Sequence, residues 1–373
     1  MTKILYMITN LAGGGAEKVL IDILRHTDYT KFDITLCLIE NHGVYIKDLP
    51  KEVSIVYLYA SRDWTYKFEF GLTKHLGMTF LQRRRIRRVI NHPYDLVISF
   101  MEGIPVRFHD YIMDKGRKNY SWVHIDLLKK HYTAQYFSQR EELGIYEKMD
   151  CVFFVSDDAR HSFGKLFNVP THEYLTIYNP IDRERIVALS TEFNPGRTMA
   201  FTFCTVGRLI SQKSYDRILR LAKRLKSEGN EVKFWILGTG PLEQELKEMA
   251  VDLGVEDMVR FLGFHKNPYP YMMVADAFIS TSMTEGYPLV ICEALCLGKP
   301  ILATDVTGPR EILGKSEHGL LVDEDDESIY KGAVSLMVNN ELRENLAGKA
   351  REKSSTFDCK KQVENIYNII IQN

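Results

Sequence analysis

Residues 277–300 have the sequence AFISTSMTEGYPLVICEALCLGKP, an apolar strand followed by a polar loop and then a helix. Pro288 suits the first turn of that helix, where its missing N–H costs nothing, and Gly298 suits the end. Glu285 then lies on the loop and Glu293 lies inside the helix. Short apolar strands that alternate with helices favour a parallel sheet wrapped by helices, and this stretch is one such unit.

The loop in this stretch is also a candidate anion site. The N–H groups of Gly286, Tyr287, Leu289 and Val290 gather at the positive end of the helix dipole, which attracts phosphate. A carboxylate such as Glu285 is unfavourable there unless it has a role, for example holding a ribose or sugar hydroxyl. The spacing alone is equally compatible with one capping glutamate followed by one solvated glutamate.

The composition of the chain predicts a soluble globular protein of two domains. It has 373 residues, 45% of them apolar, with 48 basic and 49 acidic side chains. The balanced charge argues against bulk nucleic-acid binding. Six cysteines without a Cys-x-x-Cys pair suit reduced thiols in a cytosolic enzyme. Neither a signal peptide nor a long apolar run is present, so we expect a cytoplasmic protein that does not span a membrane.

Strands alternate with helices in both halves of the chain. The expected strands are 4–8, 34–39, 53–58, 96–100, 119–123 and 151–155 in the first half and 200–206, 232–237, 259–262, 277–279, 300–303 and 319–322 in the second. This pattern predicts an α/β fold of two Rossmann-like, doubly wound parallel-sheet domains, residues 1–180 and 181–355. A helix over 356–373 is expected to pack back toward the first domain. Ligands of such sheets bind at the carboxyl ends of the strands, so we expect the site in a cleft between the domains.

Two strand-to-helix turns, one in each half, carry phosphate-binding chemistry. Gly13-Gly14-Gly15 lets a phosphate or sugar approach the backbone closely. It does not complete a dinucleotide fingerprint, because Lys18 stands where the last glycine would be, and it is equally compatible with a structural turn. In the second half, Arg208 and Lys213 are suited to neutralise a diphosphate, although each is also compatible with a solvated surface cation.

His124 follows a strand of the first half. It could hydrogen-bond a sugar hydroxyl, with Asp126 orienting it or meeting an acceptor, but a lone histidine is often structural. Trp122 is expected to pack in the core. No metal-ligand spacing is evident, and Arg208, Lys213 and helix N-termini could serve a diphosphate, so we expect no metal and no cofactor.

A basic run without acidic residues extends from Phe70 to Tyr94. It favours either a helix that docks on anionic lipid, each basic group contributing about 1 kcal/mol, or a solvated helix face. Nucleic acid is disfavoured because no reader motif accompanies the run. Its clustered arginines are Arg83, Arg84, Arg85, Arg87 and Arg88.

Taken together, these motifs resemble the retaining GT-B glycosyltransferases of family 4, glycosyl transferases group 1, which build bacterial capsule, lipopolysaccharide and glycolipid sugars. The pair Glu285-x7-Glu293 looks like the signature of that family. The first half is similar through its glycine turn, Trp122-x-His124 and Asn179-Pro180-Ile181-Asp182. In the second half the similarity extends over Gly207-Arg208-Leu209, Lys213, Gly238-Thr239-Gly240-Pro241-Leu242, Phe261-Leu262-Gly263-Phe264, Gly298-Lys299-Pro300-Ile301, Asp305, Gly308-Pro309-Arg310-Glu311 and Gly319-Leu320-Leu321-Val322.

The resemblance implies a nucleoside-diphosphate sugar donor that lies mostly on the second domain. Arg208 and Lys213 would hold its diphosphate. Glu293 would bind the ribose hydroxyls, and Glu285 would bind the transferred sugar near its 3- and 4-hydroxyls. From the first domain, Gly14 and Gly15 would close on the phosphates and His124 would reach the sugar.

The expected reaction is transfer of a hexose or N-acetylhexosamine, with UDP as the expected nucleotide, to a glycan or lipid-linked acceptor with retention at the anomeric carbon. We expect it to be metal-independent and to occur in the cytoplasm, at the inner face of the membrane if the basic run binds lipid. Two alternatives stay open. They are a nucleotide-sugar epimerase of the same architecture and a non-catalytic partner subunit that keeps the fold.

Overall fold

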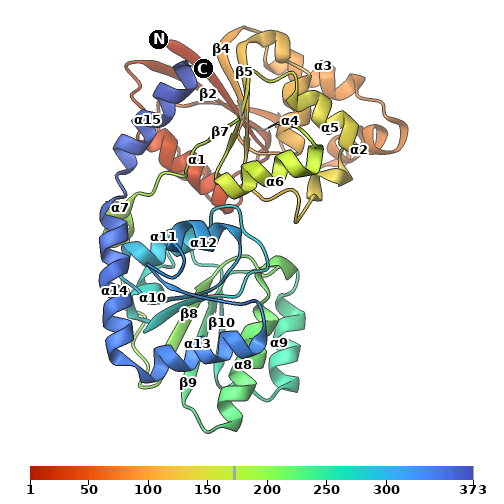
Figure 1. Cartoon of the computed structure of the whole chain (residues 1–373). Coiled ribbons are helices and arrows are strands. Elements are labelled where there is room, and N and C mark those ends of the chain that lie inside the picture. The colour runs from red at the N-terminus through yellow and green to blue at the C-terminus, as the bar shows by residue number, and fades with distance from the viewer. Residues whose placement is uncertain (171–173, 373) are drawn as a thin grey trace. The chain divides into compact units, whose positions relative to one another are not determined.

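The computed structural model describes residues 1–170 and 174–372, and the chain divides into two compact units (Figure 1). Unit 1 comprises Met1–Pro180 with Cys359–Asn373, and unit 2 comprises Ile181–Asp358. Each unit is built on its own parallel sheet, so the prediction of two Rossmann-like parallel-sheet domains is confirmed.

Unit 1 contains a seven-stranded sheet in the order β3-β2-β1-β4-β5-β6-β7, in which every printed pairing is parallel. Its strands are β1 Thr2–Ile8, β2 Phe32–Glu40, β3 Ser54–Tyr59, β4 Tyr94–Ser99, β5 Gly116–Val123, β6 Cys151–Phe154 and β7 Leu175–Thr176. Its α-helices are α1 Gly15–Arg25, α2 Trp64–Leu76, α3 Phe80–Val89, α4 Ile104–Asp110, α5 Gln139–Tyr146, α6 Asp157–Phe167 and α15 Cys359–Gln372.

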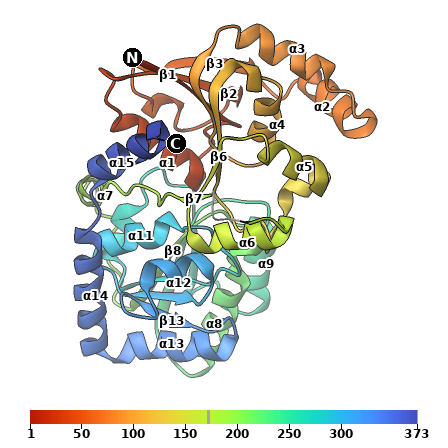
Figure 2. The same cartoon turned by 45° about the horizontal axis from the view of Figure 1, so that its top comes forward.

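Helices cover both faces of this sheet because successive side chains of a strand point to opposite faces. Leu5 and Met7 of β1 belong to an apolar cluster with α3 and α4. On the other face α1 and α15 lie side by side (Figure 2). There Tyr367 of α15 stacks on Phe32 with ring centroids 4.3 Å apart, and its hydroxyl lies 2.7 Å from the hydroxyl of Thr27. The last helix of the chain is therefore part of unit 1.

Unit 2 contains a six-stranded sheet in the order β10-β9-β8-β11-β12-β13. Its strands are β8 Phe201–Val206, β9 Val232–Leu237, β10 Val259–Gly263, β11 Ala277–Ser280, β12 Ile301–Thr304 and β13 Leu320–Val322. Its α-helices are α7 Arg183–Leu189, α8 Tyr215–Ser227, α9 Glu243–Asp252, α10 Tyr269–Val274, α11 Leu289–Cys296, α12 Thr307–Leu313, α13 Asp326–Val338 and α14 Asn340–Ser355.

The two faces of the unit 2 sheet are covered by different helices. Phe203 and Phe234 stack at 5.4 Å inside the main core, together with side chains of α8, α9 and α13. The adjacent Trp235 points the other way and contacts Tyr271 of α10 at 5.9 Å. Because β8 and β11 are neighbours in the sheet, the loops that follow their carboxyl ends are neighbours as well.

Candidate active site

Glu285 and Lys213 meet at the carboxyl ends of β8 and β11. Lys213 belongs to a 3-10 turn, Ser211–Lys213, that follows β8, and Glu285 lies between β11 and α11. The ammonium Nζ of Lys213 donates to Oε1 of Glu285 at 2.5 Å. Only 19% of the lysine side chain and 9% of the glutamate side chain are exposed, so water screens this ion pair much less than a surface pair. The structure thus brings together two charged groups that the sequence placed in separate motifs.

The backbone around Lys213 holds its side chain toward Glu285. Ser214 has φ 47°, a left-handed conformation that is unfavourable for a residue with a side chain. Thr281 stabilises this turn, because its hydroxyl donates to the carbonyl oxygens of Lys213 at 3.2 Å and of Ser214 at 3.0 Å. The side chain of Gln212 donates to the carbonyl of Thr284 at 2.8 Å. Strained turns that neighbours hold in this way are concentrated at functional sites.

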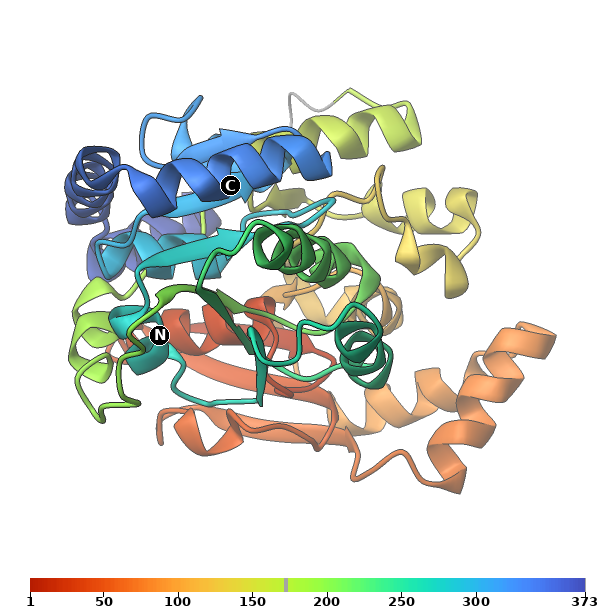
Figure 3. The same cartoon turned by 90° about the horizontal axis from the view of Figure 1, so that it is seen from below.

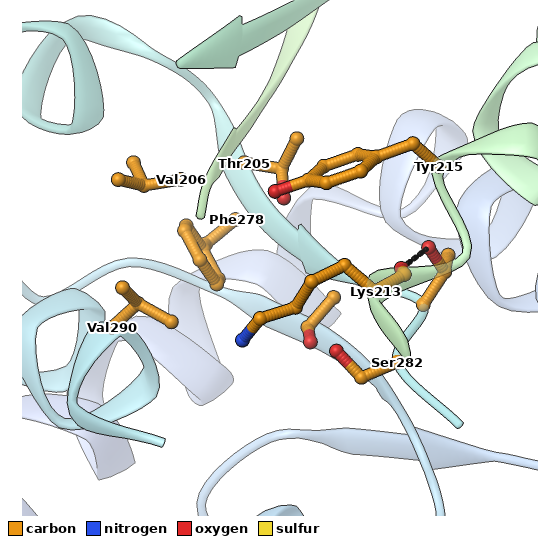
Figure 4. Close-up of a pocket in the computed structure, with 9 residues that line it drawn as sticks. Thr205, Val206, Lys213, Tyr215, Phe278, Ser282 and Val290 are labelled. Atoms are coloured by element: carbon orange, nitrogen blue, oxygen red, sulfur yellow. Dashed lines mark hydrogen bonds between the residues drawn. The ribbon is translucent and has the colours of Figure 1, made fainter. Parts of the chain in front are cut away.

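A small polar pocket lies beside the Lys213 side chain, which extends between Val290 and Ser282 in Figure 4. Hydroxyl groups dominate its polar lining. Burial raises the pKa of Tyr215, so this phenol stays neutral and able to donate. The lining residues are Thr205, Val206, Lys213, Tyr215, Phe278, Ser280, Thr281, Ser282 and Val290.

Arg208 precedes Lys213 on the same loop, but its side chain is exposed. Within the described residues its guanidinium has no hydrogen-bond or ion-pair partner. The loop that carries it is held close to the loop after β9, where a Cβ on Gly238 would lie 1.9 Å from the carbonyl oxygen of Gly207. The N–H of Leu209 donates to the carbonyl of Thr239 at 3.0 Å. The loop after β8 is therefore held in place, and the guanidinium of Arg208 on it is available to a ligand.

The helix after Glu285 begins one residue later than predicted. Pro288 is the N-cap of α11, with extended backbone at φ −70° and ψ 105°, and Leu289 and Val290 are the first helical residues. Pro288 packs against the start of α12, where a Cβ on Gly308 would lie 2.5 Å from its Cδ. The predicted stop is confirmed, because Gly298 has φ 63° directly after the C-cap.

The anion site predicted from the sequence lies at the first turn of α11, and anion binding there stays a prediction. Leu289 and Val290 open the helix, where N–H groups have no intrahelical acceptor, and Gly286 and Tyr287 form the loop just before it. Val290 also lines the pocket beside Lys213. An anion at this position would meet both the amide groups and the ammonium.

Glu293 lies inside α11 and is buried, with 4% of its surface exposed. The phenol of Tyr269, from α10, donates to its Oε1 at 3.2 Å. Sequence reasoning missed Tyr269, which precedes Glu293 by 24 residues and belongs to no motif. The two predicted glutamates are therefore held differently, Glu285 by a cation and Glu293 by a phenol.

His124 lies just beyond β5 in unit 1. Burial lowers its pKa to about 3, so the imidazole is neutral at physiological pH. Its Nε2 is buried and has no hydrogen-bond partner among the described residues. Asp126 does not orient it, since Oδ1 of Asp126 accepts the N–H groups of Leu128 and Lys129, each at 3.1 Å. Oδ2 of Asp126 likewise has no hydrogen-bond partner among the described residues, so the expectation that Asp126 orients His124 is wrong. The carboxylate of Asp126 instead stabilises the backbone of the short loop after β5. The alternative, in which Asp126 meets an acceptor, stays a prediction.

Two buried carboxylates of unit 1 were missed, although each closely follows an apolar strand expected from the sequence. Glu102, after β4, accepts the backbone N–H of His124 at 2.9 Å and the phenol of Tyr132 at 2.8 Å, and burial raises the pKa of Glu102. Glu40 ends β2 and accepts the guanidinium of Arg62 at 2.9 Å. An acidic residue one or two positions after an expected apolar strand, 34–39 for Glu40 and 96–100 for Glu102, was the signal that could have identified both.

The glycine turn of unit 1 leads from β1 to α1. Gly14 is the N-cap of α1 and Gly15 its first residue, and both are exposed. Gly13 has φ 116°, a conformation that favours glycine. The Glu17 side chain lies close to this turn, since a Cβ on Gly14 would be 2.1 Å from its Oε2, and contact of the turn with a phosphate stays a prediction.

The basic run forms α3, and three of its five arginines are engaged within unit 1. Arg85 pairs with the buried Glu69 at 2.5 Å. Arg83 pairs with Asp110 at 3.4 Å, and Arg87 pairs with Asp114 at 2.5 Å. Only Arg84 and Arg88 lack such a partner among the described residues. Glu69 of α2, Asp110 at the end of α4 and Asp114 beyond it therefore neutralise three of the five arginines, and lipid binding by the run stays a prediction.

Packing of the cysteines and of Trp122 agrees with expectation. All six cysteines are buried and none forms a disulfide, including Cys292 and Cys296 of α11. Trp122 is fully buried and contacts Phe100 and Phe153.

Within residues 1–170 and 174–372 there is no cluster of three or more metal-ligating His, Cys, Asp or Glu side chains. In the same residues no helix is both long and apolar enough to cross a membrane.

Residues 191–353, which include nearly all of unit 2, match the family of glycosyl transferases group 1. The matched residues belong to this family, and the motifs that carried the resemblance in unit 2 lie within them. Together with the similar proteins described next, this match identifies the chain as a glycosyltransferase.

Similar proteins extend over both units. The chain is 27% identical over 372 residues, 96% of each chain, to the N-acetylgalactosamine-N,N'-diacetylbacillosaminyl-diphospho-undecaprenol 4-alpha-N-acetylgalactosaminyltransferase of Campylobacter jejuni. It is 32% identical over 149 residues, 40% of this chain and 43% of the relative, to the lipopolysaccharide core biosynthesis glycosyltransferase LpsE of Rhizobium meliloti. The crystal structure of Anabaena HepE in complex with UDP and glucose covers 100% of both chains, with a TM-score of 0.81 and 20% identity. The shared fold is GT-B, as predicted.

Proposed function

We propose that this glycosyltransferase moves a hexose or N-acetylhexosamine from a UDP-sugar to a glycan or lipid-linked acceptor in cell-surface glycan synthesis. The observation that carries the proposal is the buried Lys213–Glu285 pair at the carboxyl ends of β8 and β11. A cation and a carboxylate side by side suit a ligand with an anionic diphosphate and a hydroxylated sugar. The names of two relatives support this class of acceptor, since one is a diphospho-undecaprenol N-acetylgalactosaminyltransferase and the other a glycosyltransferase of lipopolysaccharide core biosynthesis.

The donor is proposed to lie on unit 2. Arg208 and Lys213 hold the diphosphate, assisted by the amide groups of Gly286, Tyr287, Leu289 and Val290 at the start of α11. Glu293 binds the ribose hydroxyls. The separate roles proposed for the cations and for Glu293 agree with their positions. Arg208 and Lys213 share the loop after β8, whereas Glu293 lies inside α11.

Charge stabilisation then drives the reaction. The bond from the anomeric carbon to the diphosphate oxygen breaks, and Arg208 and Lys213 stabilise the departing anion. Glu285 holds the sugar near its 3- and 4-hydroxyls beside the positive charge that develops on the ring. The acceptor oxygen forms its bond on the same face while its proton passes to the leaving phosphate, so the configuration is retained. Neither a protein nucleophile nor a metal ion is part of this proposal.

Unit 1 is proposed to supply three further groups. Neutral His124 offers a buried nitrogen to a sugar hydroxyl, which an imidazolium could do only as a donor. The exposed backbone of Gly14 and Gly15 contacts the donor phosphates. No cofactor takes part beyond the nucleotide-sugar co-substrate.

A lipid-linked acceptor would be reached from a membrane surface, and the hairpin of α2 and α3 is the proposed contact. This hairpin follows the edge strand β3 and extends outward in orange in Figure 3. The only acidic side chain between residues 64 and 92 is the buried Glu69, while Arg84 and Arg88 are exposed. Large apolar side chains are exposed on the same hairpin, namely Trp64 (76%), Phe68 (53%), Leu76 (65%), Met78 (43%) and Phe80 (54%). Exposed apolar side chains and basic groups on one hairpin suit an anionic lipid surface.

Vesicle flotation tests the membrane part of the proposal. We expect binding to vesicles that contain phosphatidylglycerol and little binding to pure phosphatidylcholine. A Trp64→Ser, Phe68→Ser variant should lose most of this binding, whereas Val338→Ser, which alters an exposed valine of unit 2, should keep it. Equal binding to both vesicle types, or none to either, contradicts a membrane role.

A donor screen tests the reaction. The protein is incubated with a panel of nucleotide sugars, with and without an undecaprenyl-linked glycan, and released nucleoside diphosphate is measured. We expect release of UDP that depends on the acceptor. Formation of an epimer without acceptor would support an epimerase instead, and no release from any donor would support a non-catalytic subunit.

A further inference from the structure

Ser282 holds the carboxylate of Glu285 in place. Its hydroxyl donates to Oε1 of Glu285 at 2.6 Å, and only 1% of Ser282 is exposed. A buried hydroxyl that donates to an ionised carboxylate makes one of the stronger hydrogen bonds in proteins. Ser282 therefore restrains the orientation of the group that is proposed to bind the transferred sugar.

The two oxygens of Glu285 are used differently. Oε1 accepts from both Lys213 and Ser282. Oε2 has no hydrogen-bond partner among the described residues. With both donors on one oxygen, the carboxylate is fixed on one side and has its other oxygen available for a ligand.

The backbone on both sides of this contact is also restrained. The hydroxyl of Thr304, at the end of β12, donates to the carbonyl of Ser282 at 2.6 Å. The hydroxyl of Thr307, at the start of α12, donates to the carbonyl of Glu285 at 3.1 Å. Ser282 and Glu285 are thus anchored to a neighbouring strand and a neighbouring helix, and the hydrogen bond between them does not depend on the loop alone.

Lys213 cannot hold Glu285 alone during the reaction. Under the proposed function its ammonium also contacts the diphosphate, so its attraction to Glu285 is shared once the donor binds. Ser282 lines the same pocket but carries no net charge, so the diphosphate attracts its hydroxyl less than it attracts the ammonium of Lys213. We propose that Ser282 is a positioning residue that keeps Oε2 of Glu285 directed at a hydroxyl of the transferred sugar. This inference rests on the proposed function of Glu285.

The test compares Ser282→Ala with the parent protein on the UDP-sugar identified by the donor screen and on its 3-deoxy and 4-deoxy analogues. With the natural donor we expect kcat to fall about tenfold, while the Kd of UDP changes less than twofold. With the analogue that lacks the hydroxyl bound by Glu285, the cost of Ser282→Ala should shrink to about twofold, because the contact being positioned is gone. A purely structural serine would cost the same factor with every donor, and that result would overturn the inference.

Thr284→Val is the matched control. Thr284 is a buried hydroxyl residue of the same loop, and its Oγ1 has no hydrogen-bond partner among the described residues. Its turnover should stay within about twofold of the parent protein, since no bond to a charged group is lost. A tenfold loss in this control would show that any substitution in the loop reduces turnover. The positioning role of Ser282 would then be contradicted.

Glu285→Gln distinguishes a failure of the role proposed for Glu285 from a failure of the positioning role of Ser282. If this variant turns over normally, the proposed role of Glu285 fails, and the inference about Ser282 fails with it. If Glu285→Gln loses turnover about 10²-fold while Ser282→Ala stays within twofold of the parent, only the positioning role is wrong.

Discussion

Unit 1 and unit 2 have the same kind of sheet but use their charged side chains in opposite ways. In unit 2 the predicted cation and the predicted carboxylate, Lys213 and Glu285, meet at the carboxyl ends of neighbouring strands. In unit 1 the basic side chains of α3 mostly neutralise acids of the same unit, as Arg85 does with Glu69. In this α/β fold, the position of a charged side chain relative to the strand ends therefore indicates its role better than the number of charges that cluster together.

The physical reason lies in the backbone. Loops at the carboxyl ends of parallel strands have few regular partners, so they present side chains and amide groups to a ligand. A helix surface such as α3 is flanked by other helices, whose acids offer nearby counter-charges. The left-handed Ser214 beside Lys213 shows that unit 2 accepts local strain to keep its loop in place.

The largest expected effect comes from removing both loop cations of unit 2. An Arg208→Ala, Lys213→Ala variant should lose about 10²-fold or more in kcat/KM, because the leaving diphosphate loses its stabilising charges. The measurement is initial-rate release of UDP. Lys226→Ala, which removes an exposed cation paired with Asp257 on the same unit, should change the rate less than twofold. Near-normal turnover of the double variant would show that Arg208 and Lys213 do not stabilise the leaving diphosphate.

The next effect concerns the buried histidines of unit 1. Burial lowers the pKa of His109 to about 4 and that of His124 to about 3, from an ordinary value of 6.5. Below pH 6.5 the unfolded chain takes up protons that the folded chain excludes, so stability falls as the pH drops from about 6.5 toward 4. The slope should be about 1.4 kcal/mol per pH unit for each histidine.

Chemical denaturation at several pH values, monitored on the full chain, measures this loss. His109→Gln should reduce the slope by about one proton, since burial keeps this imidazole neutral in the folded chain and its ring nitrogens bond to the uncharged side chains of Ser99 and Asn119. A pH-independent free energy of unfolding between pH 6.5 and 4 would show that these imidazoles protonate freely in the folded state.

A smaller effect separates the arginines of α3 from one another. Arg85→Ala should cost about 1–2 kcal/mol of unfolding free energy, because it leaves the buried Glu69 without its cation. Arg84→Ala should stay within about 0.5 kcal/mol, because Arg84 is exposed and has no such pair among the described residues. Urea unfolding of the two variants gives both values, and equal costs would contradict the division of α3 into structural and free arginines.

The smallest expected effect concerns the strain beside Lys213. Ser214→Gly should stabilise the protein by roughly 0.5–1 kcal/mol, since glycine adopts a φ of 47° without steric cost. Turnover should nevertheless fall about twofold to threefold, because a looser turn positions Lys213 less well. A variant that is both less stable and fully active would argue against stored strain at this turn.

Much of the fold could be predicted from the sequence because the strands are short, apolar and separated by clear turn residues. The strand β7 was missed because Leu175–Thr176 is too short to show any periodicity. Pro288 was placed one position too far into its helix, because its φ suits the N-cap as well as the first turn.

The site could be predicted as motifs but not as contacts. Lys213 and Glu285 are separated by 72 positions, and their meeting depends on β8 and β11 being neighbours, which no local pattern reveals. Ser282 lies only three positions before Glu285, so a hydrogen bond within that loop was within reach of sequence reasoning. Glu102 contacts the backbone of His124 across 22 positions, and only the strand order brings the two together.

Calorimetric titration of UDP into the parent protein, Lys213→Ala and Glu285→Gln tests the central claim most directly. The claim is that Lys213 binds the diphosphate whereas Glu285 binds the sugar, although the two form one ion pair in the free protein. The Kd of UDP should rise about tenfold or more for Lys213→Ala and stay within about threefold for Glu285→Gln. Unchanged UDP affinity in Lys213→Ala would contradict the account.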